Sequence, residues 1–451
     1  MLLKTWLKNP LAVWTGTDCD ASNGIVVDGA RIAELVAAGN EPLCDVDQTF
    51  DASNLVVIPG LINCHHHFYQ TLTRAYPAAL NKKLFDWLVS LYPVWAGLED
   101  EGIALSTELA LAELMLSGCT TAADHHYLFT DRIRDAVDIQ VESVRKMGAR
   151  VILTRGSMSL GEKDGGLPPD SVVQGEDVIL AESERLISAY HDNREGAFVQ
   201  IALAPCSPFS VTQDLLRESA ALARQHGVLL HTHLGETDDE NQFCIDRFGK
   251  RPLDYLAEIG WLADDVWFAH GVRFTDDEVA RLGQAGTGIS HCPSSNMLLG
   301  SGICRVNDLE AAGAPVGLGV DGSASNDSSN MMQEVRQAFL LQRIGCGPAA
   351  VSHEDALRWG TAGGARVLHR PELGTLAPGQ AADLALFDLD DLRFSGSGDP
   401  VAALVLCGAH RVRHLMIGGA WRVSGGELTG VDVARLRARH QELADRLAKR
   451  A

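Results

Sequence analysis

The chain has 451 residues, of which 46% are hydrophobic and 22% are charged. This composition is typical of a folded globular protein and excludes wholesale disorder. Lysine and arginine number 38 against 59 aspartates and glutamates, and this acidity argues against binding to nucleic acid or to an anionic membrane surface. The sequence contains no run of about 18 apolar residues, so it predicts no membrane span. Ten scattered cysteines without a CxxC pair predict reduced thiols in a cytoplasmic protein, and we expect a small-molecule substrate.

The two ends of the chain share one pattern. Residues 1–58 and 372–451 contain short stretches of alternating apolar and polar residues, which predict short strands. Each end holds only half of a small β-sandwich, so we expect the two ends to meet in one composite domain. Residues 432–450 carry apolar side chains at helical spacing and predict an amphipathic C-terminal helix in that domain.

Between these ends, residues 59–371 alternate short apolar runs with longer amphipathic segments, which is typical of parallel βα units. Eight runs predict strands, at 55–63, 120–126, 149–155, 199–205, 228–233, 266–270, 286–291 and 315–321. Eight such units predict an α/β fold, a (β/α)8 TIM barrel with catalytic groups at the carboxyl ends of its strands. The long irregular stretch 156–177 is a candidate lid.

Histidines and an aspartate follow several of these strands. His65 and His67 come directly after the first strand, and residues two apart in an extended segment point the same way. His233, His270 and Asp321 end the fifth, sixth and eighth strands. Imidazole nitrogens and carboxylate oxygens bind zinc or ferrous iron, and three histidines with one aspartate leave a position for water. The pattern therefore predicts a hydrolytic metal site.

Five motifs at the strand ends carry a resemblance to a known family. They are Pro59–His67, His233 with Glu236, Phe268–Gly271, Cys292–Met297 and Gly319–Gly322. In these motifs the sequence resembles the amidohydrolase superfamily, in its cytosine deaminase, guanine deaminase and chlorohydrolase-type branch. Residues 68–75, 84–88 and 91–95 are most similar to 8-oxoguanine deaminases, which are close to hydroxyatrazine ethylaminohydrolases. The resemblance also implies the split β-sandwich and a homo-oligomer.

The resemblance bears on the number of metal ions. Binuclear members of this superfamily bridge two metals with a carbamylated lysine on the fourth strand. The fourth predicted strand here reads VQIALAP, and no lysine occurs between Lys163 and Lys250, so that bridge cannot form. We expect one divalent ion, with zinc as the default and iron as the alternative. Its expected ligands are His65, His67, His233 and Asp321.

Three residues are expected to transfer protons, and the resemblance implies the same roles. Asp321 is placed to accept a proton from water and to deliver it to the leaving amine. His270 is expected to orient the attacking hydroxide or to act as the base. Glu236 lies three residues beyond His233, so its carboxyl can reach the ring nitrogen beside the attacked carbon.

Contacts to the substrate ring are predicted near the same strand ends. Gln70 offers a donor and an acceptor to a purine or pyrimidine edge, and Arg74 and Arg155 are candidates for pairing with a ring carbonyl. Candidates for stacking on a flat ring are Trp95, Tyr92 and Tyr127. One of His125 and His126 is expected to face the pocket, and the pattern leaves open which one.

The sequence thus predicts a metal-dependent hydrolytic deaminase of a nucleobase. The resemblance favours conversion of 8-oxoguanine to uric acid and ammonia, by attack of a metal-activated water on the amine-bearing ring carbon. The alternatives are deamination of guanine or isocytosine and removal of ethylamine from hydroxyatrazine, which use the same metal, acid and base. A catalytically inactive barrel scaffold is disfavoured, because every expected ligand and proton-transfer residue is present.

Overall fold

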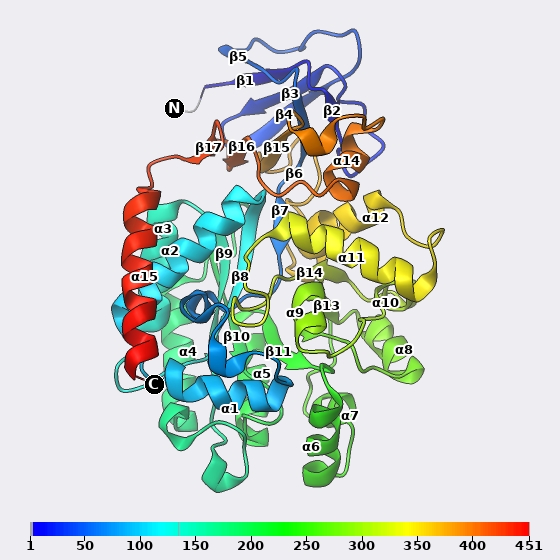
Figure 1. The fold of residues 1–451 in the computed structure, drawn as a ribbon. Helices are drawn as coiled ribbons and strands as arrows, with labels where there is room; N and C mark the ends of the chain where they lie inside the picture. Colours follow the sequence, from blue (N-terminus) through cyan, green and yellow to red (C-terminus); the bar gives the residue numbers. More distant parts are fainter. Residues whose placement is uncertain (1–2, 134, 451) are drawn as a thin grey trace.

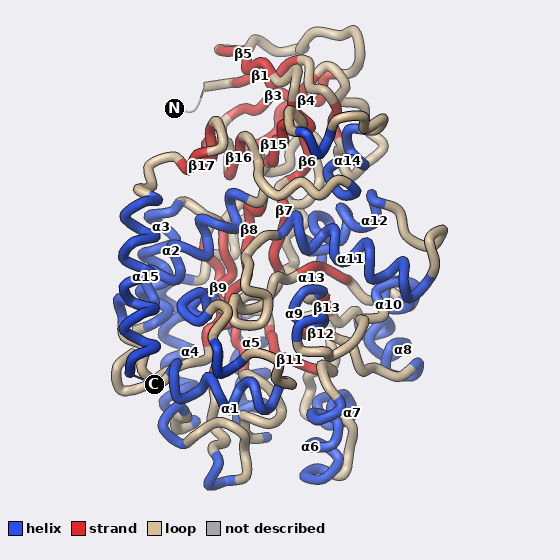
Figure 2. The backbone as a smooth tube through the Cα atoms, viewed as in Figure 1, coloured by secondary structure: helices blue, strands red, loops and turns tan. Residues whose placement is uncertain are grey.

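The computed structural model describes residues 3–133 and 135–450. It contains a closed barrel and, beside one end of that barrel, a smaller domain of two sheets (Figure 1). Figure 2 shows the barrel strands within a shell of helices and the strands of the smaller domain above them. Within the described residues, no helix is both long enough and apolar enough to cross a membrane.

The barrel is closed by eight strands, and every neighbouring pair is parallel. The order around the barrel is β10-β11-β12-β13-β14-β7-β8-β9. The strands are β7 (Leu61–Asn63), β8 (Cys119–His126), β9 (Arg150–Ser157), β10 (Val199–Pro205), β11 (Leu230–Leu234), β12 (Val266–His270), β13 (Gly288–His291) and β14 (Val316–Leu318). The predicted (β/α)8 barrel is confirmed.

Helices follow the barrel strands and cover its outside (Figure 1). The longer ones are α1 (Leu84–Trp95), α2 (Asp100–Leu116), α3 (Ala136–Met147), α4 (Glu176–Tyr190), α5 (Gln213–His226), α6 (Asp238–Phe248), α8 (Asp276–Ala285) and α11 (Met331–Cys346). The shorter ones are η1 (Phe68–Thr73), α7 (Pro252–Glu258), α9 (Pro293–Leu298), α10 (Val306–Ala312), α12 (His353–Arg358) and α13 (Gly364–Val367).

Local sequence signals set the ends of these helices. Helix α5 begins after Thr212, whose hydroxyl caps its first turn, and ends at Gly227 with a φ of 66°. Helix α8 begins with a capping box at Thr275 and ends at Gly286 with a φ of 71°. Threonine satisfies free N–H groups at a helix start, and glycine adopts the left-handed conformation at a helix end without a steric penalty. The spacing of apolar residues predicts helices over 214–225 and 276–284, and these match α5 and α8 to within one residue at each end.

The smaller domain joins both ends of the chain. One sheet has the order β4-β3-β1-β5 and the other the order β18-β17-β16-β15-β6-β2. The strands are β1 (Thr5–Lys8), β2 (Ala12–Val13), β3 (Gly24–Asp28), β4 (Arg31–Val36), β5 (Gln48–Asp51), β6 (Leu55–Pro59), β15 (Leu384–Asp388), β16 (His414–Ile417), β17 (Ala420–Ser424) and β18 (Glu427–Leu428), with helix α14 (Pro400–Leu406) between β15 and β16. Pairing of β6 with β15 brings residues more than 300 positions apart into one sheet, as the pattern predicted.

The run 55–63, expected as one barrel strand, is two strands in the structure. Strand β6 pairs antiparallel with β15 in the smaller domain, whereas β7 pairs parallel with β8 in the barrel. Gly60 lies between them, and a Cβ there would be 2.2 Å from the hydroxyl oxygen of Thr120. Glycine is therefore required where the chain passes from one sheet to the other.

The C-terminal helix α15 (Val433–Arg450) lies on the barrel, alongside α2 (Figure 1). Its buried face consists of Leu436, His440, Leu443 and Leu447. Arg439 and Arg446 both form ion pairs with Glu101 of α2. The expected helix is present, but it packs on α2, η1 and α1 of the barrel.

Candidate metal and catalytic site

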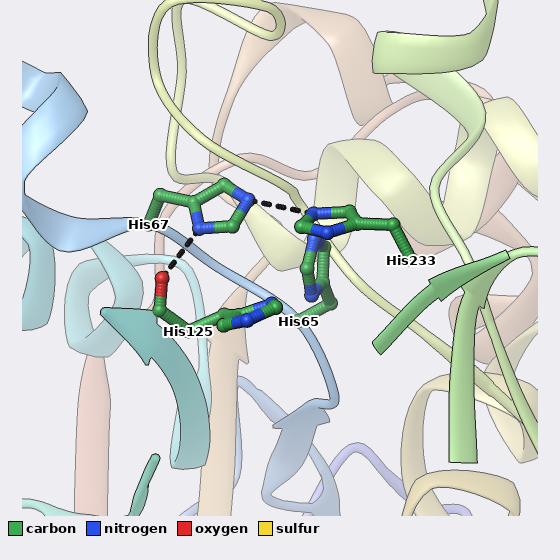
Figure 3. Close-up of side chains that lie close together, drawn as sticks. All are labelled: His65, His67, His125 and His233. Atoms are coloured by element: carbon green, nitrogen blue, oxygen red, sulfur yellow. Dashed lines mark hydrogen bonds between the residues drawn. The ribbon is translucent and has the colours of Figure 1, made fainter. Parts of the chain in front are cut away.

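Three histidines and one aspartate converge at the carboxyl ends of the barrel strands. Nε2 of His67 lies 3.1 Å from Nε2 of His233, and Oδ1 of Asp321 lies 3.3 Å from Nε2 of both His65 and His67. His65 and His67 follow β7, His233 belongs to β11, and Asp321 follows β14. Figure 3 shows the imidazole rings directed toward one another. The sequence prediction named these four residues, and the structure brings them together.

Hydrogen bonds determine which ring nitrogens of this cluster carry protons. Nδ1 of His67 lies 2.6 Å from the carbonyl oxygen of His125, and Nδ1 of His233 lies 2.6 Å from that of Cys206 (the first is dashed in Figure 3). A carbonyl oxygen only accepts, so each Nδ1 donates a proton and each Nε2 keeps a lone pair. Burial also lowers the pKa of His233 well below 6.5, which keeps that ring neutral.

His65 is oriented through a second histidine. Nδ1 of His231 donates to the carbonyl oxygen of Trp267 over 2.8 Å, and the His231 ring stacks on the Trp267 ring. Nε2 of His231 therefore accepts, over 2.8 Å, from Nδ1 of His65. Nε2 of His65 is left with a lone pair and has no hydrogen-bond partner among the described residues. Partners of this kind fix the ring orientation of metal ligands.

The donor set fits a divalent cation. The atoms that converge are three imidazole lone pairs and a carboxylate oxygen, all acceptors, and none of them supplies a proton to the others. Lone pairs 3.1 to 3.3 Å apart repel one another unless a cation lies between them. Nitrogen and oxygen ligands of this type suit zinc. Strand β10, which reads VQIALAP, contains no lysine to bridge a second ion.

The ring of His125 faces this cluster, and that of His126 faces away from it. His125 stacks on His233 with ring centroids 4.7 Å apart, and its Nε2 donates to the carbonyl oxygen of Ala204 over 2.9 Å. Nε2 of His126 instead donates to the carbonyl oxygen of Leu128 over 2.7 Å. Successive residues of a strand point to opposite sides, so only one of the two reaches the barrel interior.

Asp321 is held in place by hydroxyl groups and by its own backbone. Its Oδ2 accepts from the hydroxyl of Ser295 over 2.6 Å and from that of Ser325 over 3.0 Å. Asp321 has a φ of 63° and His270 a φ of 76°, left-handed conformations that are strained for residues other than glycine. Such strain is maintained only where the surroundings hold the residue firmly, and it is common at active sites.

Glu236 and His270 form a second pair beside the metal cluster. Nε2 of His270 lies 3.5 Å from Oε2 of Glu236, and Nδ1 of His270 donates to Oδ1 of Asn296 over 3.0 Å. Burial, reinforced by the charge of Asp321, raises the pKa of Glu236 to about 8. A carboxyl group with that pKa is protonated at neutral pH and can donate a proton. The backbone N–H of Glu236 donates to Glu240 Oε2 over 2.8 Å, which fixes the main chain that carries it.

His67, His233, Asp321, Glu236 and His270 line one cavity. Its wall consists of His67, Gln70, Leu84, Trp87, Leu88, Tyr92, Tyr127, Cys206, Phe209, His233, Glu236, His270, Leu299, Asp321 and Ser325. A cavity that combines apolar and aromatic side chains with converging polar groups is typical of a site for a small molecule. Gln70 contributes a donor, because its Oε1 accepts from the backbone N–H of Ala324 over 3.4 Å and its Nε2 has no described partner.

Three residues expected to contact the substrate lie outside this lining. Arg74 forms an ion pair with Glu113 of α2. Nε1 of Trp95 donates to the hydroxyl of Thr73 over 3.1 Å, so the indole is bound to the last residue of η1. The guanidinium of Arg155 lies 3.8 Å from the centroid of the Phe129 ring. The structure thus gives all three side chains protein partners away from the cavity.

Several wall residues were not identified as ring contacts from the sequence. They are Leu84, Trp87, Leu88, Phe209 and Leu299. The first three lie on α1, and in the sequence residues 84–88 carry only a family resemblance. Nε1 of Trp87 donates to the carbonyl oxygen of Ala324 over 3.0 Å, the same residue whose N–H binds Gln70. One residue of the loop after β14 therefore orients two residues of the wall.

The segment 156–177 touches this wall from outside. The backbone N–H of Leu167 donates to the carbonyl oxygen of Phe209 over 3.1 Å, and Phe209 lines the cavity. The segment contains two short 3-10 turns, η3 (Glu162–Asp164) and η4 (Asp170–Val172). Its role as a lid stays a prediction.

Comparison with known proteins assigns the family. A model described as the amidohydrolase family matches residues 56–422, which include every residue of the cluster. The chain belongs to the amidohydrolase family. This amidohydrolase is 59% identical over 444 residues to the 8-oxoguanine deaminase of Pseudomonas aeruginosa, and the match covers 98% of this chain and 99% of that enzyme. The resemblance drawn from the motifs is confirmed.

More distant relatives of the amidohydrolase act on triazines by name. It is 38% identical to the hydroxydechloroatrazine ethylaminohydrolase of a Pseudomonas species, over 93% of this chain and 89% of that protein. The crystal structure of an atrazine chlorohydrolase from Arthrobacter aurescens, complexed with zinc, matches at a TM-score of 0.91 and 29% identity. That match covers 98% of this chain and 100% of the other. Proteins named for different reactions thus match this chain over nearly their whole length.

Proposed function

We propose that this amidohydrolase is a hydrolytic nucleobase deaminase that converts 8-oxoguanine and water to uric acid and ammonia. One observation carries the proposal, the 59% identity to an 8-oxoguanine deaminase over 98% of the chain. The complete set of converging ligands and the adjacent acid–base pair support it, because an inactive scaffold needs neither.

We infer that one divalent cation is held by four residues, and zinc is the ion we expect. They are His65, His67, His233 and Asp321. When bound there, such a cation lowers the pKa of water to roughly 7 and so supplies a nucleophile at neutral pH. The three neutral imidazoles and one carboxylate carry a single negative charge, which leaves the site with net positive charge once it is loaded.

The chain's own residues then move the protons. Because Nδ1 of His270 donates to Asn296, its Nε2 is free to orient the attacking water and accept from it. Asp321 accepts a proton from that water and delivers it to the leaving amine, which departs as ammonia. Glu236, protonated at neutral pH, donates to the ring nitrogen beside the attacked carbon. It recovers a proton when the added hydroxyl group loses its own and becomes the product carbonyl. Each general acid–base step of this kind contributes about 10²–10⁴-fold.

A second candidate is removal of ethylamine from hydroxyatrazine, which the 38% identical ethylaminohydrolase favours. Both substrates present an amine on a ring carbon next to a ring nitrogen, so the same metal, acid and base serve either reaction. Guanine and isocytosine present the same arrangement. Discrimination among these substrates must therefore come from the wall of the cavity and not from the metal cluster.

The test is ammonia release by metal-replete enzyme, with kcat/KM measured for 8-oxoguanine, guanine, isocytosine and hydroxyatrazine under identical conditions. We expect 8-oxoguanine to have the highest value. A tenfold preference for guanine or hydroxyatrazine would overturn the substrate and leave the mechanism standing. Failure to deaminate any nucleobase would overturn the proposed function.

The composite domain boundaries, a homo-oligomeric state and a cytoplasmic location stay predictions.

A further inference from the structure

Tyr92 lines the cavity and carries a buried, unpaired hydroxyl group. The residue belongs to α1, is 1% exposed and lines the same cavity as Gln70 and Glu236. Its hydroxyl has no hydrogen-bond partner among the described residues. Buried hydroxyl groups are nearly always paired, because removing an unpaired one from water costs free energy. An exception on a residue that lines a binding cavity is a candidate for a partner that arrives with the ligand.

The surroundings of Tyr92 indicate which kind of chemical group that partner carries. Much of the wall beside it is apolar, from Leu84, Leu88 and Phe209. Burial raises the pKa of Tyr92 well above 10, so the phenol stays neutral and can donate. Gln70 offers a second unpaired donor, its Nε2. A ring that enters this cavity therefore meets donors on two elements, η1 and α1, and needs acceptor atoms to satisfy them.

We propose that Tyr92 is a specificity-determining residue whose hydroxyl donates a hydrogen bond to the carbonyl oxygen that distinguishes 8-oxoguanine from guanine. This inference rests on the proposed function. Guanine has a C–H group at that position, so its binding leaves the hydroxyl buried and unpaired. A site built to bind a polar group rejects an analogue that lacks it for this reason.

The experiment compares Tyr92→Phe with the unaltered enzyme on both purines. The variant removes one oxygen and keeps the ring, so the shape of the wall is retained. We expect kcat/KM for 8-oxoguanine to fall roughly tenfold, as for loss of one neutral hydrogen bond, while that for guanine stays the same or rises. The ratio of the two values is the decisive readout, because a merely structural role lowers both values alike.

A matched control exists in the same chain. Tyr255 on α7 also carries a buried hydroxyl without a described partner, but its ring stacks on Phe248, and it does not line the cavity. Tyr255→Phe is therefore expected to leave the ratio of the two substrates unchanged. An equal change in the ratio in both variants would overturn the inference.

Binding of the products gives a second measurement that needs no turnover. Uric acid retains the distinguishing carbonyl, and xanthine, the product from guanine, lacks it. Tyr92→Phe is expected to weaken uric acid binding roughly tenfold relative to xanthine. If the unaltered enzyme deaminates 8-oxoguanine but neither ratio changes, the role of Tyr92 is overturned and the proposed function stands. If the unaltered enzyme deaminates guanine and not 8-oxoguanine, the proposed substrate fails first, and this inference fails with it.

Discussion

The metal cluster and the wall formed by η1 and α1 differ in how their polar atoms are satisfied. In the cluster, the Nδ1 atoms of His65, His67 and His233 are each bound to the protein, and their Nε2 atoms meet at one centre. In the wall, Gln70 and Tyr92 each have an unpaired donor. The cluster therefore presents acceptor atoms that suit a cation, whereas the wall presents donors that suit acceptor atoms of a ligand.

This difference matches the distribution of function among relatives. The relatives are named as a deaminase, an ethylaminohydrolase and a chlorohydrolase, which fits our proposal that the strand ends supply the shared chemistry. On that proposal, specificity depends on the wall of the cavity. Variants in the cluster should therefore lower the activity with every substrate. Variants in the wall should change the order of substrate preference.

The largest effect is expected from loss of a metal ligand. His65→Ala or Asp321→Ala should lower the metal content from about one ion per chain toward zero. Activity should fall at least roughly 10³-fold with every substrate, because the source of the nucleophile is lost. Elemental analysis and ammonia release measure the two quantities.

His410→Ala is the control for metal loss. His410 is exposed and bonded to Arg393 in the smaller domain, so its loss should change neither metal content nor activity. Two tightly bound ions per unaltered chain would contradict the mononuclear site.

The next effect is loss of the proton donor. Glu236→Gln should keep the metal and lower kcat by about 10²–10⁴-fold. Since the pKa of Glu236 is raised to about 8, its acid form predominates below that pH. The kcat/KM of the unaltered enzyme should therefore fall as the pH rises through about 8, and the variant should lack this decrease. A variant with the same decrease, or with near-native turnover, would remove Glu236 from the mechanism.

A smaller effect is expected from the aromatic part of the wall. Trp87→Ala should raise KM roughly 10- to 100-fold, because base–aromatic stacking contributes about 1–3 kcal/mol, while the metal is retained and kcat changes less. Trp421→Ala, in the smaller domain, is the control and should leave KM unchanged. An unaltered KM in Trp87→Ala would show that the indole only supports the fold.

The smallest effect concerns the support behind the wall. Nε2 of His440 on α15 lies 3.0 Å from the hydroxyl of Thr71, the residue after Gln70. Burial lowers the pKa of His440 to about 4, so the ring is neutral. His440→Leu should raise KM about two- to tenfold through η1, the value of one hydrogen bond.

Two further variants on α15 test that support. His440→Gln, which can still bind Thr71, should restore most of the affinity. Glu442→Ala, on the exposed face of the same helix, should leave KM unchanged. Equal KM values in all three variants would show that α15 does not contribute to substrate binding.

The sequence predicted the barrel strands and the convergence of His65, His67, His233 and Asp321, but it did not predict which side chains line the cavity. Strand position follows from local apolar runs, and the carboxyl ends of parallel strands meet at one face of a barrel. The side chains of Arg74, Trp95 and Arg155 carried the right chemistry for ring binding. Arg74 lies 39 residues from Glu113, its ion-pair partner, and no local pattern predicts that contact.

The sequence alone was sufficient to predict the barrel and the convergence of four side chains, those of His65, His67, His233 and Asp321. The reason is that the local hydrophobic pattern and the alternation along a strand decide which residues share a strand end. Three-dimensional packing was needed to show that His125 faces inward, that α15 supports η1, and that Tyr92 keeps an unpaired hydroxyl in the cavity. The physical reason is that a side chain's partners are chosen among residues distant in the chain. Whether a polar atom is satisfied or left for a ligand is therefore a property of the folded protein.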